Sequence, residues 1–139
     1  MQIKSLLLAT LSLVALVRAD AATQAAADQA DQQIRFLSHD QVASATHNGT
    51  WLLLFGPKWC GYTQRFTPKW LQVQNTVDQE HLNVNLAKID CTTDADFCTG
   101  APYHVTGYPT VILVRNGQVA QEYPGADEVQ PLLDYIHQL

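Results

Sequence analysis

Positive charge is scarce in this sequence. The 139 residues include 8 Lys and Arg against 13 Asp and Glu, which gives a formal net charge of -5, and both signs are scattered along the chain. A protein that binds nucleic acid usually gathers Lys and Arg on one face, where they neutralise phosphates. Because no such cluster is present, we expect no nucleic-acid partner.

Long apolar runs are missing as well. The run from Leu6 to Val17 holds about a dozen residues, whereas a membrane-spanning helix needs roughly 20. It follows Lys4 and closes on Val17-Arg18-Ala19, with small residues where a signal peptidase reads the chain. We expect residues 1–19 to be a cleaved signal peptide, with an uncleaved membrane anchor as the alternative. The mature chain is then expected to have no membrane span and to be soluble within the secretory pathway.

A clear retrieval signal is not present at the other end. The chain ends Ile136-His137-Gln138-Leu139, which only faintly resembles the acidic, Leu-terminated tetrapeptide that retrieval receptors read. Retention in the endoplasmic reticulum lumen and secretion therefore both stay open.

Size and composition indicate a single domain. A chain of 139 residues with 47% hydrophobic residues and three Trp can build one core, and it contains no internal repeat. Residues 20–33 are mostly Ala, Gln and Asp, with no aromatic or large aliphatic side chain, so we expect a flexible, at most weakly helical leader. The domain itself is expected at residues 34–139.

Strand and helix patterns alternate along this domain. Short apolar runs indicate strands, and apolar residues three and four apart indicate helices. The dipeptide Asn116-Gly117 suits the two positive-φ positions of a tight hairpin. The expected elements are strands at 34–37, 50–55, 84–89, 110–115 and 118–123, helices at 40–46 (capped by Ser38) and 60–79 (kinked at Pro68), a short helix or turn at 94–103, and a final helix after Asp127. This order predicts an α/β fold with a central mixed β-sheet, helices on both faces, and a C-terminal β-hairpin plus helix.

Cys60 lies where the loop after the central strand meets the start of the long helix. Unpaired backbone N–H groups and the helix dipole favour the thiolate there, and the thiolate is the nucleophilic form of cysteine. Lys58 and Arg65 can add nearby positive charge. The preceding Gly56-Pro57 and the adjacent Trp59 favour an exposed, reactive thiol over the alternative, which is a buried and inert one.

Several features together resemble a thioredoxin-fold domain of the protein disulfide isomerase family. They are the stretch WCGYT at 59–63, Pro68 five residues later, the strand at 84–90, and Gly107-Tyr108-Pro109-Thr110 before the hairpin. The resemblance covers 34–139. WCG followed by GYPT at this separation is a specific pairing, whereas either stretch alone is a weak signal.

By this resemblance Cys60 is the attacking cysteine of an active-site motif that also contains Trp59, Gly61, Tyr62 and Thr63. Trp59 is expected to shield one side of the sulfur, with plain packing as its alternative role. Tyr62 stands where the family has a histidine, and Thr63 stands where it has the resolving cysteine.

The resemblance also implies that Tyr108 and Pro109 bind substrate. Pro109 matches a cis-proline that faces the thiol and helps to hold an extended substrate. Only about 5–6% of X-Pro bonds in folded proteins are cis, so the family pattern carries this expectation.

Three departures from the family pattern point to weakened turnover. With Thr63 in place of a second sulfur, the site cannot form an intramolecular disulfide, so it cannot act as a dithiol oxidase or reductase. Leu54 stands where the family keeps a buried carboxylate that moves protons during exchange. Ala126 lies in a region where isomerase domains commonly carry an arginine that tunes the thiol.

Cys91 and Cys98 are expected to form a structural disulfide. Two nearby cysteines usually pair in an oxidising compartment, and a loop this short adds roughly 2–3 kcal/mol. Some disulfide isomerase domains carry a similar pair. One alternative is a zinc site completed by His81 or His104, which the six-residue spacing disfavours; another is that Cys98 resolves adducts of Cys60. We expect no metal and no cofactor.

Asn48 is an expected N-glycosylation site. Asn48-Gly49-Thr50 is an acceptor triplet on a turn-like Asn-Gly, which fits an exposed position in the secretory pathway. Such triplets are also common by chance.

Two functions fit these residues. The first is a weak monothiol isomerase that forms a mixed disulfide between Cys60 and a client protein and is released by a client thiol or glutathione. The second is a non-catalytic chaperone or retention factor that traps client cysteines, with Tyr62, Tyr108 and Pro109 as a docking rim.

Overall fold

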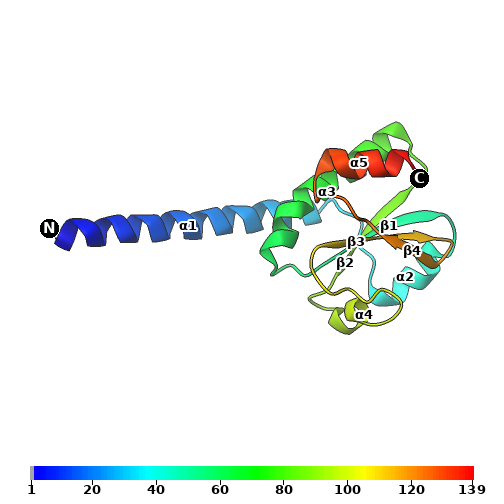
Figure 1. Ribbon diagram of the computed structural model, residues 1–139, viewed down its shortest axis with the longest axis horizontal. Helices are drawn as coiled ribbons and strands as arrows, with labels where there is room; N and C mark the ends of the chain where they lie inside the picture. The colour runs from blue at the N-terminus through cyan, green and yellow to red at the C-terminus, as the bar shows by residue number, and fades with distance from the viewer. Residues whose placement is uncertain (1) are drawn as a thin grey trace.

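The centre of the fold is a four-stranded mixed sheet with strand order β2-β1-β3-β4 (Figure 1). The computed structural model describes the backbone of residues 2–139 and the side chains of residues 13–139. Strand β1 pairs in parallel with β2 and antiparallel with β3, and β3 pairs antiparallel with β4. The strands are β1 (Thr50–Gly56), β2 (Asn85–Asp90), β3 (Thr110–Arg115) and β4 (Gln118–Glu122). The expected α/β fold with a mixed sheet is confirmed.

The helices fall close to the expected positions. The helices are α1 (Gln2–Asp31), α2 (His39–Thr46), α3 (Gly61–Glu80), α4 (Ala95–Thr99) and α5 (Val129–His137). Ser38 is the N-cap of α2, and its backbone N–H donates to the side chain of Gln41. Pro68 lies inside α3, which continues on both sides of it.

Both faces of the sheet are covered, which explains why β1 is apolar without alternation. Leu52, Leu54 and Leu86 pack on one face with residues of α3 and α5. Leu53 and Phe55 pack on the other face with residues of α2 and α4. Figure 1 shows α3 and α5 above the sheet and α2 and α4 below it.

The hairpin between β3 and β4 turns at Asn116 and Gly117, as predicted. Both residues have positive φ, 49° and 80°, which is the conformation that this dipeptide adopts most readily. Asn116 also joins the hairpin to the start of β1, because its side-chain oxygen accepts a 2.9 Å hydrogen bond from the N–H of Gly49.

The strand expected at 34–37 is reduced to one isolated parallel bridge between Phe36 and Lys88. Lys88 donates its N–H to Arg35 O, and Leu37 donates its N–H to Lys88 O. The segment then enters α2 at His39, so too few residues remain beside β2 to extend the ladder.

Most of the segment expected to be a flexible leader, residues 20–31, forms the last part of α1. Ala27 and Ala30 are each 4% exposed, and Ala30 belongs to the core cluster that includes Phe66 and Trp70 of α3. Large apolar side chains are not needed for burial here, because small ones let the two helices approach closely. The folded body therefore begins before residue 34.

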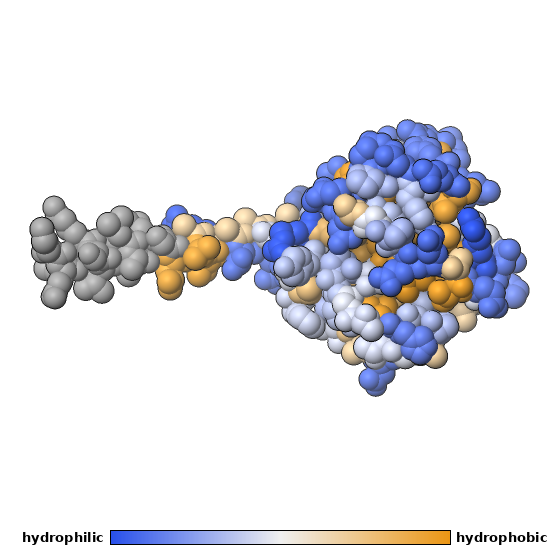
Figure 2. Space-filling view, in the orientation of Figure 1, coloured by the Kyte–Doolittle hydropathy of each residue, from blue (hydrophilic) through white to orange (hydrophobic). Residues whose placement is uncertain are grey.

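The earlier part of α1 projects away from this body (Figure 1). Leu13, Val14, Leu16 and Val17 are exposed on it, and they form the apolar stretch visible on the projecting helix in Figure 2. This stretch lies within the expected signal peptide. Among the described residues, no helix has the length and apolar character needed to cross a membrane.

Candidate functional site

Cys60 is the N-cap residue of α3, with extended backbone angles of φ -79° and ψ 121°. Its carbonyl accepts a 2.9 Å hydrogen bond from the N–H of Gln64, and its own N–H donates to Pro57 O at 3.3 Å. The thiol is free, and the residue is half-buried rather than enclosed. The sulfur therefore lies where the first N–H groups of a 20-residue helix lack intrahelical partners.

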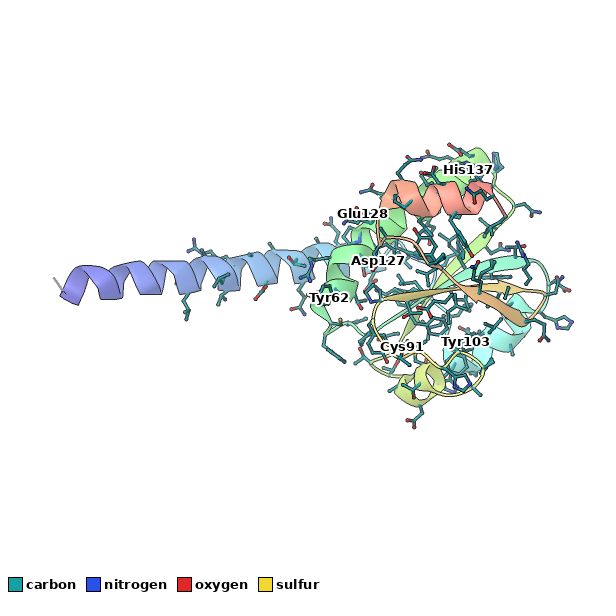
Figure 3. The ribbon with its side chains drawn as sticks, in the orientation of Figure 1. Tyr62, Cys91, Tyr103, Asp127, Glu128 and His137 are labelled. Atoms are coloured by element: carbon teal, nitrogen blue, oxygen red, sulfur yellow. A yellow bond between two sulfur atoms is a disulfide. The ribbon has the colours of Figure 1, made fainter. Side chains whose placement is uncertain are left out.

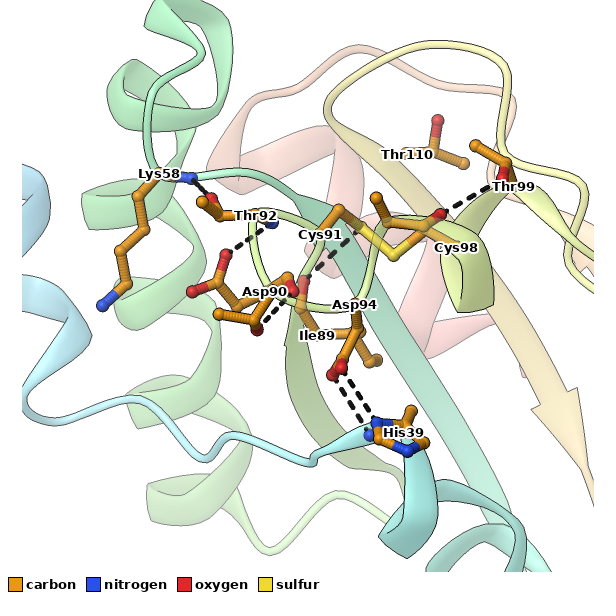
Figure 4. The surroundings of a disulfide bond; sticks show 12 residues. His39, Lys58, Ile89, Asp90, Cys91, Thr92, Asp94, Cys98, Thr99 and Thr110 are labelled. Carbon is orange, nitrogen blue, oxygen red and sulfur yellow. Dashed lines mark hydrogen bonds and ion pairs between the residues drawn. A yellow bond between two sulfur atoms is a disulfide. The ribbon is translucent and has the colours of Figure 1, made fainter.

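The loop that carries Cys60 is fastened on two sides. The N–H of Lys58 donates to Thr92 Oγ1 at 2.9 Å, a contact drawn in Figure 4. The carbonyl of Lys58 accepts a 2.8 Å hydrogen bond from the side chain of Gln64. These bonds tie the loop to the end of β2 and to α3, which limits how far Cys60 can move.

Exposed aromatic side chains flank the thiol in the chain. Trp59 and Tyr62 are each 69% exposed. The Trp59 ring meets the ring of Tyr108 edge-on, with centroids 6.4 Å apart, so WCGYT and GYPT lie side by side. Tyr62 lies at the first turn of α3, at the edge of the body (Figure 3), and the Arg65 guanidinium lies 4.7 Å above its ring.

The Tyr108–Pro109 peptide bond is cis. A second cis bond, Ala101–Pro102, was not anticipated from the sequence. Pro109 leads directly into β3 at Thr110. The Trp59–Tyr108 contact therefore joins the start of β3 to the loop before α3.

Thr63, the position at which the resemblance expects a second cysteine, is 1% exposed and faces the interior. Its Oγ1 has no hydrogen-bond partner among the described side chains. Its carbonyl accepts a 2.7 Å hydrogen bond from Thr67 Oγ1. Gly61, between Cys60 and Tyr62, is confined by Arg65, whose Nη1 would lie 3.3 Å from a Cβ at that position.

Cys91 and Cys98 are joined in a disulfide with Cα atoms 6.0 Å apart, shown in Figure 4. Both belong to the core cluster on the α2 and α4 face. With both sulfurs in this bond, neither can ligate zinc or resolve an adduct of Cys60. Among residues 13–139, no three His, Cys, Asp or Glu side chains are grouped as a metal site would require.

Two aromatic contacts and one hydrogen bond support this region. Tyr103 packs against Phe55 and Phe97, with ring centroids 4.9 and 5.3 Å apart, and burial raises the pKa of its hydroxyl. His39 Nδ1 lies 2.9 Å from Asp94 Oδ1 (Figure 4), which connects the start of α2 to the N-cap of α4.

A buried ion pair that was not expected from the sequence joins β2 to the end of α1. Lys88 of β2 is 1% exposed, and its ammonium lies 2.8 Å from Asp31 Oδ1 at the end of α1. Lysine is rarely buried without a partner. A lysine within the apolar run Leu86–Ile89 was therefore a usable signal that a carboxylate would meet it.

Leu54 and Ala126 are the other two residues that are expected to differ from the family pattern. Leu54 is fully buried and pairs in register with Lys88 on the adjacent strand. It therefore offers the ammonium an apolar neighbour. Ala126 uses its carbonyl to accept a 2.8 Å hydrogen bond from the hydroxyl of Tyr123, and its side chain carries no charge.

Asn48 is exposed in the bend before β1, two residues from Thr50. Its backbone carbonyl accepts a hydrogen bond from the Trp51 indole. Cys60 follows the opposite end of the same strand, so the triplet and the thiol lie at opposite ends of β1.

Comparisons with known proteins agree with this fold. A family model described as Thioredoxin matches residues 33–138. Thioredoxin domain-containing protein 5 homolog of Drosophila melanogaster is 33% identical over 97 residues, which cover 70% of this chain and 23% of that protein. Endoplasmic reticulum resident protein 44 of Bos taurus is 34% identical over 91 residues, covering 63% of this chain and 22% of that protein.

A crystal structure of human ERp44 superimposes with a TM-score of 0.69 at 29% identity, covering 76% of this chain and 29% of the other. The expected thioredoxin-like fold is thereby confirmed. The chain spans less than a third of each of these three relatives.

Proposed function

Because this chain belongs to the thioredoxin family, we propose that it is a thiol–disulfide exchange protein of the secretory pathway that acts through Cys60 alone. The observation that carries the proposal is the position of one free, half-buried thiol at the N-cap of α3. Thr63, which is buried, takes the position where the family has the second cysteine of the motif. The site is thus built for one attacking sulfur.

The reaction follows from a single thiol. The thiolate of Cys60 attacks one sulfur of a client disulfide, the client S–S bond breaks, and the other client sulfur leaves as a thiolate. A second thiol, from the client or from glutathione, then attacks the mixed disulfide and releases Cys60. One disulfide is consumed and one is formed, so the cycle rearranges disulfides without net oxidation.

The surface beside the thiol supports binding of an unfolded client. Trp59 and Tyr62 present large exposed aromatic faces, and Tyr108 extends this surface through its contact with Trp59. Aromatic side chains bury much area at low entropic cost. We assign docking of an extended client segment to these residues and Pro109.

Trapping of client cysteines is the second candidate. It is favoured by the arrangement at Thr63, because no second thiol is available there to release an adduct from within the chain. Exchange and trapping both form the same mixed disulfide. The two functions differ in its lifetime, which is short in exchange and long in trapping.

The proposed compartment rests on two features. Residues 1–19 have the pattern of a signal peptide, and one relative is named an endoplasmic reticulum resident protein. The proposed glycan at Asn48 belongs to the same compartment. Its presence is tested by the mass lost from the secreted or luminal protein on treatment with peptide N-glycosidase.

Refolding of scrambled ribonuclease in a glutathione buffer tests the function. The protein is compared with its C60S variant, and recovery of ribonuclease activity that depends on Cys60 supports exchange. Equal recovery with both proteins, combined with no covalent adduct to Cys60, contradicts both candidates.

The lifetime of the adduct decides between exchange and trapping. Samples are quenched with N-ethylmaleimide at successive times and separated without reductant. Adducts that appear and decay with the refolding reaction indicate exchange, whereas adducts that accumulate without recovery of activity indicate trapping.

A further inference from the structure

We propose that Asp31 is a positioning residue for Cys60, and that the end of α1 is a working part of the site rather than a leader. The proposal rests on the proposed role of Cys60 in exchange. Asp31 lies two residues before the segment that the family model matches. It reaches the first turn of α3 through Lys88 and Thr67, in three steps that the structure shows.

The first step is the ion pair. The Lys88 ammonium is almost completely buried, and Asp31 is the one carboxylate within salt-bridge distance of it among residues 13–139. The ring of Phe36 lies 5.4 Å from the same nitrogen. An ammonium removed from water needs a charged or hydrogen-bonding partner, and removal of one partner of a buried pair is strongly destabilising.

The second step leads from Lys88 to α3. Lys88 Nζ donates a 3.0 Å hydrogen bond to Thr67 Oγ1. A hydroxyl has one proton, and Thr67 donates that proton to the carbonyl of Thr63 at 2.7 Å. Lys88 therefore fixes the rotamer in which Thr67 holds Thr63.

The third step is the location of Thr63. It is the third residue of α3 and follows the N-cap Cys60 by three positions. Its carbonyl belongs to the turn whose N–H groups lie nearest the thiol. Asp31 thus connects through consecutive hydrogen bonds to the turn that presents Cys60.

Packing of α1 supports the same connection. Ala27, Asp31 and Lys88 lie around one nearly filled recess together with Thr63 and Gln64. Gln64 is the residue that bonds the carbonyl of Lys58 in the Cys60 loop. The end of α1 therefore covers the inner side of the first turn of α3.

The neighbouring strand offers no substitute for Asp31. Leu54 pairs in register with Lys88 in the parallel ladder between β1 and β2, and both side chains lie on the α3 side of the sheet. Because Leu54 is apolar, it cannot balance the charge of Lys88, and Asp31 of α1 is the residue that does so. The dependence of this site on α1 follows from that arrangement.

The test separates positioning from mere support of the fold. In the full chain, D31L/K88M replaces both charges with apolar side chains of similar size, a change that often preserves or increases stability. It also removes the hydrogen bond to Thr67. We expect D31L/K88M to keep its urea unfolding midpoint, while the rate constant of Cys60 with an aromatic disulfide probe near pH 6 falls by about threefold or more.

Amide hydrogen exchange of residues 61–67 provides a readout that does not depend on thiol reactivity. We expect faster exchange in D31L/K88M, and also in T67V, which leaves the ion pair in place and removes only the hydroxyl that joins it to Thr63. D20N is the matched control, because Asp20 lies on the same helix, about three turns before Asp31, and is exposed. It is expected to match the wild type in both readouts.

The outcomes are distinct. If T67V and D31L/K88M both match the wild type in exchange of residues 61–67 and in probe rate, Asp31 has no positioning role and the proposal is overturned. If the wild-type thiol itself does not react with the probe, the proposed function fails, while the exchange data still decide the role of Asp31.

Discussion

The side chain of Thr63 lies directly against Gly56, with no space for a methyl group between them. A Cβ added to Gly56 would lie 2.5 Å from Thr63 Cγ2 and 2.7 Å from Oγ1. Gly56 ends β1 and Thr63 lies in the first turn of α3. This contact limits how closely α3 can approach β1.

Substitution of Gly56 with alanine should therefore be costly. We expect G56A to lower the free energy of unfolding by about 1–3 kcal/mol, the usual cost of overpacking a tight contact. Urea unfolding followed by tryptophan fluorescence measures the change. G107A is the matched control, since a Cβ at Gly107 meets no atom within 4 Å. A G56A variant as stable as G107A would refute the steric account.

Substitution of Thr63 with cysteine should give the site a second sulfur. Thr63 and cysteine have similar volumes, and the spacing to Cys60 becomes that of a Cys-X-X-Cys motif. We expect T63C to form an intramolecular disulfide. We also expect it to shorten the lifetime of the mixed disulfide with a client by roughly tenfold or more, because the thiol that releases the client is then in the same chain.

Mass spectrometry after treatment with oxidised glutathione measures the disulfide in T63C as a loss of two hydrogens. T63S is the control that retains a small polar side chain without sulfur. If adducts of T63C live as long as those of T63S, the buried position of residue 63 prevents it from reaching Cys60.

Removal of the exposed aromatic side chains should weaken client binding without changing the thiol. We expect W59A and Y62A to slow adduct formation with an unfolded disulfide-containing client several-fold, because each ring that packs against the client contributes roughly 1 kcal/mol. The rate of Y62A with a small disulfide probe should stay unchanged, and the rate of W59A should not fall, because loss of a ring that shields the sulfur can only open access to it. V119A is the control, since Val119 is exposed on β4. Equal slowing with the small probe would show that these rings act on the sulfur instead.

The disulfide between Cys91 and Cys98 should stabilise the fold and leave the chemistry of Cys60 unaltered. The two residues are separated by seven positions, and closing a loop of about that length contributes roughly 2–3 kcal/mol. We expect C91A/C98A to lose at least that much stability, because the substitution also empties part of a buried cluster. Unfolding in urea gives the stability, and the probe rate reports on Cys60. A large change in that rate would link the disulfide to the active site.

Stability should fall at alkaline pH in part through Tyr103. Burial raises the pKa of this hydroxyl above its ordinary value of 10.0, so the unfolded chain loses the proton first as pH rises. Above the pKa that Tyr103 has in the unfolded chain, unfolding therefore releases a proton, and the free energy of unfolding falls as pH rises. Below that pKa, the stabilisation that comes from the raised pKa of Tyr103 is fully present.

Phenylalanine at position 103 removes this titration. We expect the free energy of unfolding of Y103F to fall less steeply than that of the wild type between about pH 9.5 and 11. Tyr123 and Tyr135, whose pKa values burial also raises, remain in both proteins and cancel in the comparison. A C60S background prevents thiol exchange during the measurement. Identical slopes would mean that Tyr103 ionises equally in the folded and unfolded chains.

Local patterns were enough for most of the fold. The apolar run at 50–55 can be buried only between two layers of helices, and Asn116-Gly117 favours one turn type through its own backbone preferences. The apolar run at 34–37 indicates burial but not how many neighbouring backbone groups are available for pairing, so its single bridge does not follow from the sequence. The burial of Ala27 and Ala30 does not follow from it either, since these small side chains are covered only where another helix lies against them.

Strand and helix periodicity and the order of residues are local properties, and they are enough to predict a cysteine at the start of a long helix with no second cysteine close to it in the sequence. Three contacts follow from tertiary packing instead: Trp59 meets Tyr108, Thr63 faces Gly56, and Asp31 balances Lys88 across 57 positions of the chain. Such contacts depend on how separate elements pack, and a buried charge selects its partner only once the surrounding layers exclude water.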